Sequence, residues 1–238
     1  MDVPRTVTAA LDDRPVDGTV CLEAGAGVGN TTAGLLAAGA KRVYAVTNDP
    51  SHAAIVRDRF TRESDRLAVL NADLHSIPLA ADSVDLITAH GLFNLLAPGS
   101  LDRIADELTR VAAPGCHLVV DDYEPLPEEA AVSDLFALEN AAAELVTGTP
   151  ALSFYPERVL RRLFVGSGWR FDRSRTLLDP VPWTASHLEA HAAEIQGLSA
   201  ELPAELGGVL TAETDRLVRR IESESVGVMY SLALQLPG

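Results

Sequence analysis

The 238-residue sequence suits one α/β domain, and its 47% hydrophobic content excludes a disordered or fibrous chain. The formal net charge is −15 and Lys41 is the only lysine, so the surface would repel nucleic-acid phosphates and anionic membranes. An acid excess with arginine in place of lysine also resembles the composition of halophilic proteins, in which the charge reflects the solvent rather than the substrate. We expect no nucleic-acid partner.

The sequence has no run near the roughly 20 apolar residues that a membrane-spanning helix needs. Its N-terminus lacks the basic patch and apolar stretch of a signal peptide, so we expect a cytoplasmic protein without a membrane partner. Cys21 and Cys116 lie in or beside predicted strands, which favours two buried, reduced thiols over a disulfide.

Short apolar runs alternate with helical patterns in the first half of the chain, which is typical of a doubly wound, mostly parallel sheet. Helix signals include Gly39 as a C-cap and Ser100 as an N-cap. Strands are predicted at 18–23, 42–46, 67–70, 84–89 and 117–120. Helices are predicted at 7–11, 30–38, 51–61 and 101–113.

The second half is more helical, and two further strands bring the predicted sheet to seven. These strands are at 170–178 and 227–236. Helices are predicted at 128–146, 156–165 and 185–224, the last interrupted at Pro203 and near Gly207 and Gly208. We expect one α/β domain over 1–238, in which the helical insertions form a cap.

A glycine-rich segment links the first strand to the first long helix. From Glu23 to Gly29 the sequence reads E-A-G-A-G-V-G, and its glycines permit a tight turn and close approach of a ligand. A dinucleotide fingerprint, G-x-G-x-x-G, would place the third glycine one residue later. An acid followed by G-x-G-x-G instead resembles the class I S-adenosylmethionine-dependent methyltransferases. The alternative, a glycine turn in another α/β domain, stays open.

Further motifs in the family's order strengthen this resemblance. They are N-A-D-L at 71–74, I-P-L at 77–79 with D-S-V-D-L-I at 82–87, and L-T-R-V at 108–111 with P-G at 114–115. The resemblance implies that Glu23 lies near the methionine amino group and that Gly25 and Gly27 lie against the cofactor. It also implies that Asp73 meets the adenine amino group, beside Leu74.

The sequence departs from the family after the second strand. The family has an acid there that accepts hydrogen bonds from both ribose hydroxyls, whereas this chain has Thr47. A threonine offers one neutral contact, and charge-assisted hydrogen bonds are about twice as strong as neutral ones. Asn48 or Asp49 could reach the ribose instead.

The resemblance places the substrate side just after the fourth and fifth strands. His90 is a candidate catalytic base because its ordinary pKa lies near neutrality, and it would also border the cofactor; a histidine merely hydrogen-bonded at a strand end is the alternative. Asp85 is expected to be structural. Asp121 and Asp122 could act on the substrate, although consecutive acids on a loop are more often solvated or capping. The residues expected to contact the acceptor are Phe93, Asn94, Asp122 and Tyr123.

The insertions carry two further candidate features. His187 and His191 lie one helical turn apart, but without a third ligand or the H-E-x-x-H glutamate they favour a solvated face, so no metal is expected. Five aromatic residues either line an acceptor pocket beneath the cap or pack in the core. They are Phe136, Phe154, Tyr155, Trp169 and Trp183.

Together these motifs predict an S-adenosylmethionine-dependent methyltransferase that methylates an O, N or C atom of a small molecule and releases S-adenosylhomocysteine. Residues 1–122 would form the cofactor-binding half and 123–238 the substrate-side half, in a monomer or homodimer. The alternatives are a non-catalytic domain that binds cofactor or a partner, a protein methyltransferase and, more distantly, a nicotinamide-dependent oxidoreductase.

Overall fold

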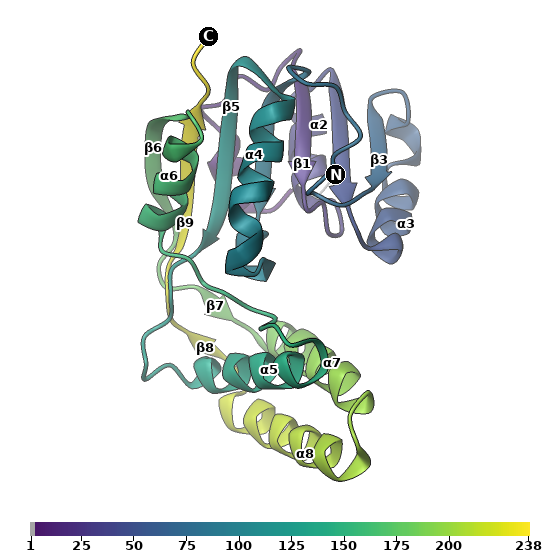
Figure 1. Ribbon diagram of the computed structural model, residues 1–238, viewed down its shortest axis with the longest axis vertical. Coiled ribbons are helices and arrows are strands. Elements are labelled where there is room, and N and C mark those ends of the chain that lie inside the picture. The colour runs from purple at the N-terminus through teal and green to yellow at the C-terminus, as the bar shows by residue number, and fades with distance from the viewer. Residues whose placement is uncertain (1–2) are drawn as a thin grey trace.

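The computed structural model describes residues 3–238, and its main feature is a seven-stranded sheet in the order β3-β2-β1-β4-β5-β9-β6 (Figure 1). The first five strands pair in parallel, and β9 lies antiparallel between β5 and β6. The predicted doubly wound, mostly parallel, seven-stranded fold is confirmed. The strands are β1 (Val20–Ala24), β2 (Arg42–Thr47), β3 (Leu67–Asn71), β4 (Val84–His90), β5 (Ala112–Tyr123), β6 (Arg170–Leu178) and β9 (Met229–Gln235).

Helices cover both faces of this sheet because its strands are apolar on both sides. On β1, Cys21 packs into one core and Leu22 into the other. The helices α1 (Arg5–Leu11), α2 (Asn30–Ala37) and α3 (Pro50–Arg59) cover the Cys21 face. The helices α4 (Leu101–Val111) and α6 (Glu157–Gly166) cover the Leu22 face. Both cysteines are buried and free, as expected.

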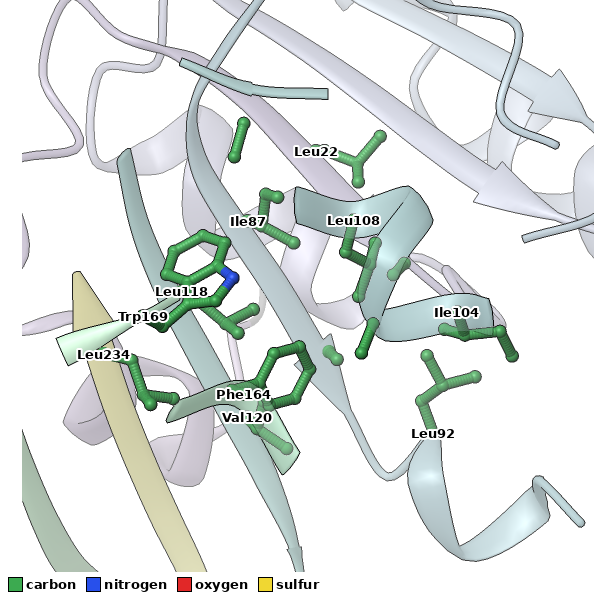
Figure 2. Packing of buried hydrophobic residues seen from close by; sticks show 14 of the residues in the cluster. Leu22, Ile87, Leu92, Ile104, Leu108, Leu118, Val120, Phe164, Trp169 and Leu234 are labelled. Atoms are coloured by element: carbon green, nitrogen blue, oxygen red, sulfur yellow. The ribbon is translucent and has the colours of Figure 1, made fainter. Parts of the chain in front are cut away.

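Figure 2 shows the core beneath α4 and α6, where Leu108 and Phe164 meet β4 and β5. Trp169 lies in this core with 2% of its surface exposed, and its indole N–H donates to Thr109 Oγ1 at 2.8 Å. The idea that Trp169 lines a pocket beneath the cap is therefore wrong. The indole fills the gap between α6 and the sheet, and its one polar atom is satisfied.

The expected cap lies beyond the carboxyl ends of the parallel strands (Figure 1). It consists of α5 (Ala131–Thr147), α7 (Ala185–Ala200), α8 (Ala204–Ile221) and two short strands, β7 (Pro182–Trp183) and β8 (Glu224–Ser225). Its helices share a core of their own, built around Leu135, Leu188 and Leu210. No helix within residues 3–238 is both long and apolar enough to cross a membrane.

Several local expectations need correction. Ser100 makes no side-chain capping bond, because the turn Pro98–Ser100 runs directly into α4. The helix ends at Val111 and β5 begins at Ala112, so the strand passes through Pro114 and Gly115 with Gly115 at a φ of +85°. Gly39 does follow the end of α2, with a φ of +90°.

The predicted interruption at Gly207 and Gly208 is also wrong, since α8 runs through both glycines. A Cβ added at Gly207 would overlap the backbone carbonyl of Ser199 on α7, so this glycine permits close approach of the two helices. Gly208 is exposed, and an added Cβ would meet nothing within 4 Å.

These neighbouring glycines give a matched stability test. Gly207→Ala should lower the free energy of unfolding by about 1–3 kcal/mol, because the methyl group forces α7 and α8 apart. Gly208→Ala should raise it by about 0.5–1 kcal/mol, because alanine favours the helix. Urea unfolding of both variants checks this, and equal effects would contradict the helix-contact role of Gly207.

Candidate cofactor site and active site

The glycine loop joins β1 to α2 through three residues of positive φ, at +72° for Gly25, +49° for Gly27 and +81° for Gly29. Side chains at the outer two would collide, since an added Cβ would lie 2.7 Å from Leu92 at Gly25 and 2.7 Å from Phe60 at Gly29. At Gly27 it would meet nothing within 4 Å. Gly27 therefore leaves open backbone that a ligand can approach, whereas the other two glycines serve packing.

A pocket of about 180 Å³ lies beside this loop at the carboxyl ends of the parallel strands. Its lining includes four residues predicted to contact the cofactor, namely Gly25, Asn48, Asp73 and Leu74, together with Thr47, the departure from the family pattern. The other predicted contacts, Glu23, Gly27, Asp49 and His90, are not among its lining residues. Sequence reasoning missed His75, Leu92, Leu95, Leu96 and Ile104. Most of these missed residues form an apolar wall, which suits a flat heterocycle such as adenine, while Asn48 and Asp73 supply polar groups at the edge.

The residues at the end of β2 differ in what they contact, which the sequence alone did not settle. Asp49 accepts hydrogen bonds through Oδ1 from the backbone N–H groups of Ser51 at 2.7 Å and His52 at 3.4 Å, so it caps α3. Thr47 is buried and its hydroxyl accepts from the Asp49 N–H at 3.2 Å. Asn48 is exposed at the pocket, which makes it the better placed of the two candidates for a ribose contact.

Asp73 lies at the pocket with its side chain mostly exposed. Its Oδ1 accepts from the His75 N–H at 2.9 Å, and this bond together with the His75 ring holds the pKa of Asp73 below its usual range. The ionised carboxylate has further acceptor capacity for an amino group.

Glu23 is the penultimate residue of β1 with 2% of its surface exposed, and its carboxylate accepts a hydrogen bond from the Thr32 hydroxyl. Burial raises the pKa of Glu23 to about 7, against the opposing effects of Thr32 and His90. A buried carboxyl poised near neutrality can ionise when a cation arrives beside it.

His90 and Asp121 form a hydrogen-bonded pair, with 2.9 Å between Nδ1 and Oδ2. Burial alone would lower the pKa of His90, but the hydrogen bond and charge of Asp121 raise it above its ordinary value. Asp121 is 3% exposed, so the expectation of a solvated or capping aspartate is wrong. Its Oδ1 has no hydrogen-bond partner within the described chain. Asp85, by contrast, accepts from the Val20 N–H at 2.9 Å, in keeping with its structural assignment.

Asp122 holds the chain segment that follows β4. It accepts from Asn94 through the backbone N–H at 3.1 Å and the side-chain amide at 2.9 Å, and burial raises its pKa. Phe93 is fully buried, edge-on to Phe164. Phe93, Asn94 and Asp122 are thus buried and do not line the pocket beside the glycine loop, and acceptor contact by these residues stays a prediction.

Tyr123 ends β5 on the same face as Asp121 and joins an aromatic cluster in the cap. Its ring centroid lies 5.4 Å from that of Trp183 and 6.4 Å from that of Phe154, and Phe136 contacts both of these rings. Burial raises the pKa of Tyr123 to about 12, so its phenol stays neutral. Tyr155 instead binds the core, donating from its hydroxyl to the Leu96 carbonyl at 2.7 Å.

The two cap histidines do not form a metal site. His187 is exposed and completes the capping box of Thr184. His191 is half-buried against Phe136, with its Nδ1 2.6 Å from the buried Glu139 carboxylate, so the solvated-face expectation fails for it. Across residues 3–238, no group of three or more His, Cys, Asp or Glu side chains could hold a metal ion.

A larger groove of about 610 Å³ lies elsewhere, lined by α1, the following loop and the end of α2. It includes Val16 and Asp17, which precede β1, so it lies at the amino end of that strand. Ligands of doubly wound sheets bind at the carboxyl ends, near the crossing of strand order, which is where the glycine loop lies.

Solved structures of the same fold include a SAM-dependent methyltransferase from Aquifex aeolicus, with a TM-score of 0.60 and 15% identity over 97% of this chain and 89% of that one. The cyclase SpnF also shares the fold, with a TM-score of 0.65 and 18% identity over 98% of this chain and 80% of that one. The fold is therefore that of the class I methyltransferases. SpnF, which shares it, is named as a cyclase and not as a methyltransferase.

Residues 21–115 match the model of a family described as a methyltransferase domain. A demethylmenaquinone methyltransferase from Clavibacter sepedonicus is 34% identical over 115 residues, which are 48% of this chain and 44% of that protein. The chain thus spans less than half the length of this relative. The segment 21–115 thus matches the methyltransferase domain family, which confirms the resemblance found in its motifs.

The open backbone at Gly27 predicts that a large side chain at this position blocks cofactor binding. Gly27→Arg should abolish binding of S-adenosylhomocysteine in calorimetry, because the side chain would fill the space that the ligand needs. Gly18→Arg is the control, since Gly18 has a similar φ of +73° and equal free space but lies before β1. Binding retained by Gly27→Arg, or lost equally in both folded variants, would refute this cofactor position.

The raised pKa of the buried Glu23 predicts how the free energy of unfolding depends on pH. Its pKa rises from 4.5 to about 7 on folding, so its stabilising contribution is complete below about pH 4.5 and is lost as the pH rises through about 7. The free energy of unfolding of the wild type should therefore fall, relative to that of Glu23→Gln, by about 2–3 kcal/mol as the pH rises from about 5 to about 8. Urea unfolding without ligand checks this, and parallel pH profiles would contradict the raised pKa.

Proposed function

We propose that the protein uses S-adenosylmethionine to methylate an apolar small molecule. The observation that carries this proposal is the open backbone at Gly27, in a loop whose Gly25 lines a pocket together with Thr47, Asn48 and Asp73. All of these residues lie inside the segment that matches the methyltransferase family model. When bound, the cofactor would supply a methyl group already activated by a sulfonium.

The chain's own residues would bind and orient the donor. Gly27 would admit it against the backbone, Asn48 would contact the ribose, and the ionised Asp73 would accept from the adenine amino group. The buried carboxyl of Glu23 would attract the ammonium and sulfonium charges. In this assignment residues 1–122 form the cofactor-binding half.

The acceptor would bind between the sheet edge and the cap, in the half formed by residues 123–238. The aromatic cluster of Tyr123, Phe136, Phe154 and Trp183 supports an apolar acceptor, because such rings bind hydrophobic and flat groups. Demethylmenaquinone, named for the Clavibacter relative, is an acceptor of this kind. Much of the rate would come from holding the acceptor in line with the methyl group and excluding water.

One alternative is that the domain binds the cofactor without transferring its methyl group. The cyclase SpnF supports it, because the fold does not dictate methyl transfer. Thr47 in place of the ribose-binding acid favours it as well, through weaker cofactor binding. Calorimetry distinguishes binding from turnover, and NAD serves there as the ligand of the oxidoreductase alternative.

Transfer of a labelled methyl group from S-adenosylmethionine to a short-chain demethylmenaquinol tests the proposal. We expect labelled quinol and S-adenosylhomocysteine in equal amounts, and His90→Gln should slow turnover by about 10²–10⁴-fold if it removes a general base. Tight binding of S-adenosylhomocysteine without transfer to this quinol, or to other small metabolites, would favour the non-catalytic alternative. Binding of NAD but of neither adenosyl ligand would contradict the whole proposal.

A further inference from the structure

We propose that Asp121 is a positioning residue that fixes His90 as the general base for the methyl acceptor. This inference rests on the proposed function. It concerns a residue that the sequence left between a substrate contact and a solvated or capping role, and which the structure buries beside the candidate base.

Two paired strands hold the pair rigidly. His90 and Asp121 are register partners on the parallel strands β4 and β5, so their side chains leave the sheet on the same face. The backbone N–H of Gly91 donates to the Asp121 carbonyl at 2.7 Å, which fixes the chain immediately after the histidine. A site placed on strands is more precise than one placed on loops.

The hydrogen bond selects one tautomer of the ring. An ionised carboxylate only accepts hydrogen bonds, so the 2.9 Å contact requires the proton on Nδ1 of His90. The neutral imidazole then carries its lone pair on Nε2. The His90 side chain is 23% exposed and that of Asp121 5%, so the ring is the accessible end of the pair and the carboxylate its buried end.

The surrounding charges favour proton uptake by this ring. Glu23 from β1 and Asp121 and Asp122 from β5 are the charged groups that act on His90, and all three are acids. Asp121 is the one in direct contact, and no donor within the described chain neutralises its second oxygen. Its charge therefore acts on the imidazole without competition.

The proposed step conserves atoms and charge. An electron pair of the acceptor, a lone pair on O or N or a π pair of an electron-rich ring carbon, would form the bond to the methyl carbon as the carbon–sulfur bond of S-adenosylmethionine breaks, and the electron pair of the broken bond would stay on sulfur. The acceptor's proton moves to Nε2 of His90, and the imidazolium, stabilised by Asp121, later releases it to solvent. Asp121 keeps its own charge throughout.

Asp122 provides a matched control on the same strand. Its side chain points to the opposite face of the sheet and accepts from Asn94 and Tyr123, and within residues 3–238 it makes no hydrogen bond to His90. Asp121→Asn and Asp122→Asn each remove one buried negative charge from neighbouring positions. A merely structural role for Asp121 would make the two variants behave alike.

Nuclear magnetic resonance of the full chain with labelled histidine tests the pairing without an acceptor. The His90 resonance is assigned with His90→Gln and titrated between about pH 5 and pH 9. We expect Asp121→Asn to lower the proton affinity of His90 at least about tenfold and Asp122→Asn to lower it much less. An unchanged affinity in Asp121→Asn, or equal shifts in both variants, would overturn the inference.

Turnover of the short-chain demethylmenaquinol tests the consequence for catalysis. Asp121→Asn should lower kcat at least about tenfold and move its pH profile in step with His90, with binding of S-adenosylhomocysteine little changed. His90→Gln and the double variant should lose equal activity, because the pair acts as one unit. Additive losses, or an unmoved pH profile, would overturn the role of Asp121. A quinol that is not methylated by the wild type would contradict the proposed acceptor while the resonance shift still decides the pairing.

Discussion

The parallel pairing of β4 with β5 is the constraint on which the site depends. It sets His90 beside Asp121, and one residue further along β5 it directs Asp122 to the other face, where this carboxylate holds the segment after β4. That segment supplies Leu92 and Leu96 to the candidate cofactor pocket. One register thus positions the candidate base, its partner and a wall of the pocket.

This arrangement concentrates buried acids at one edge of the sheet. Glu23, Asp121 and Asp122 are each at most 3% exposed, and burial of carboxylates opposes folding unless hydrogen bonds or opposite charges compensate. Thr32, His90 and Asn94 provide that compensation within the chain. What remains is a strongly acidic site edge, which suits a cationic sulfonium donor and lies below a cap whose rings suit an apolar acceptor.

The sheet and the glycine loop could be predicted because both depend on short-range sequence signals. These are apolar runs for the strands and glycines at positions that need a positive φ for the loop. Both ends of β6 were predicted correctly. The predicted break at Gly207 was wrong, because this glycine permits close contact with the neighbouring helix α7. In the site, too, residues that depend on local motifs were predicted, and residues that depend on long-range contacts were not. Asp73 was found from its motif, but the burial of Asp121 depends on strand pairing, which an aspartate pair in sequence does not reveal.

We propose above all that the carboxyl edge of β1, β2 and β4 binds the adenosyl cofactor. A crystal structure of the full chain with S-adenosylhomocysteine tests it most directly. We expect the ligand against the backbone of Gly27, with its adenine near Asp73 and its sulfur on the side of His90. Density for the ligand in the larger groove between α1 and α2, with the glycine loop empty, would rule out this binding site.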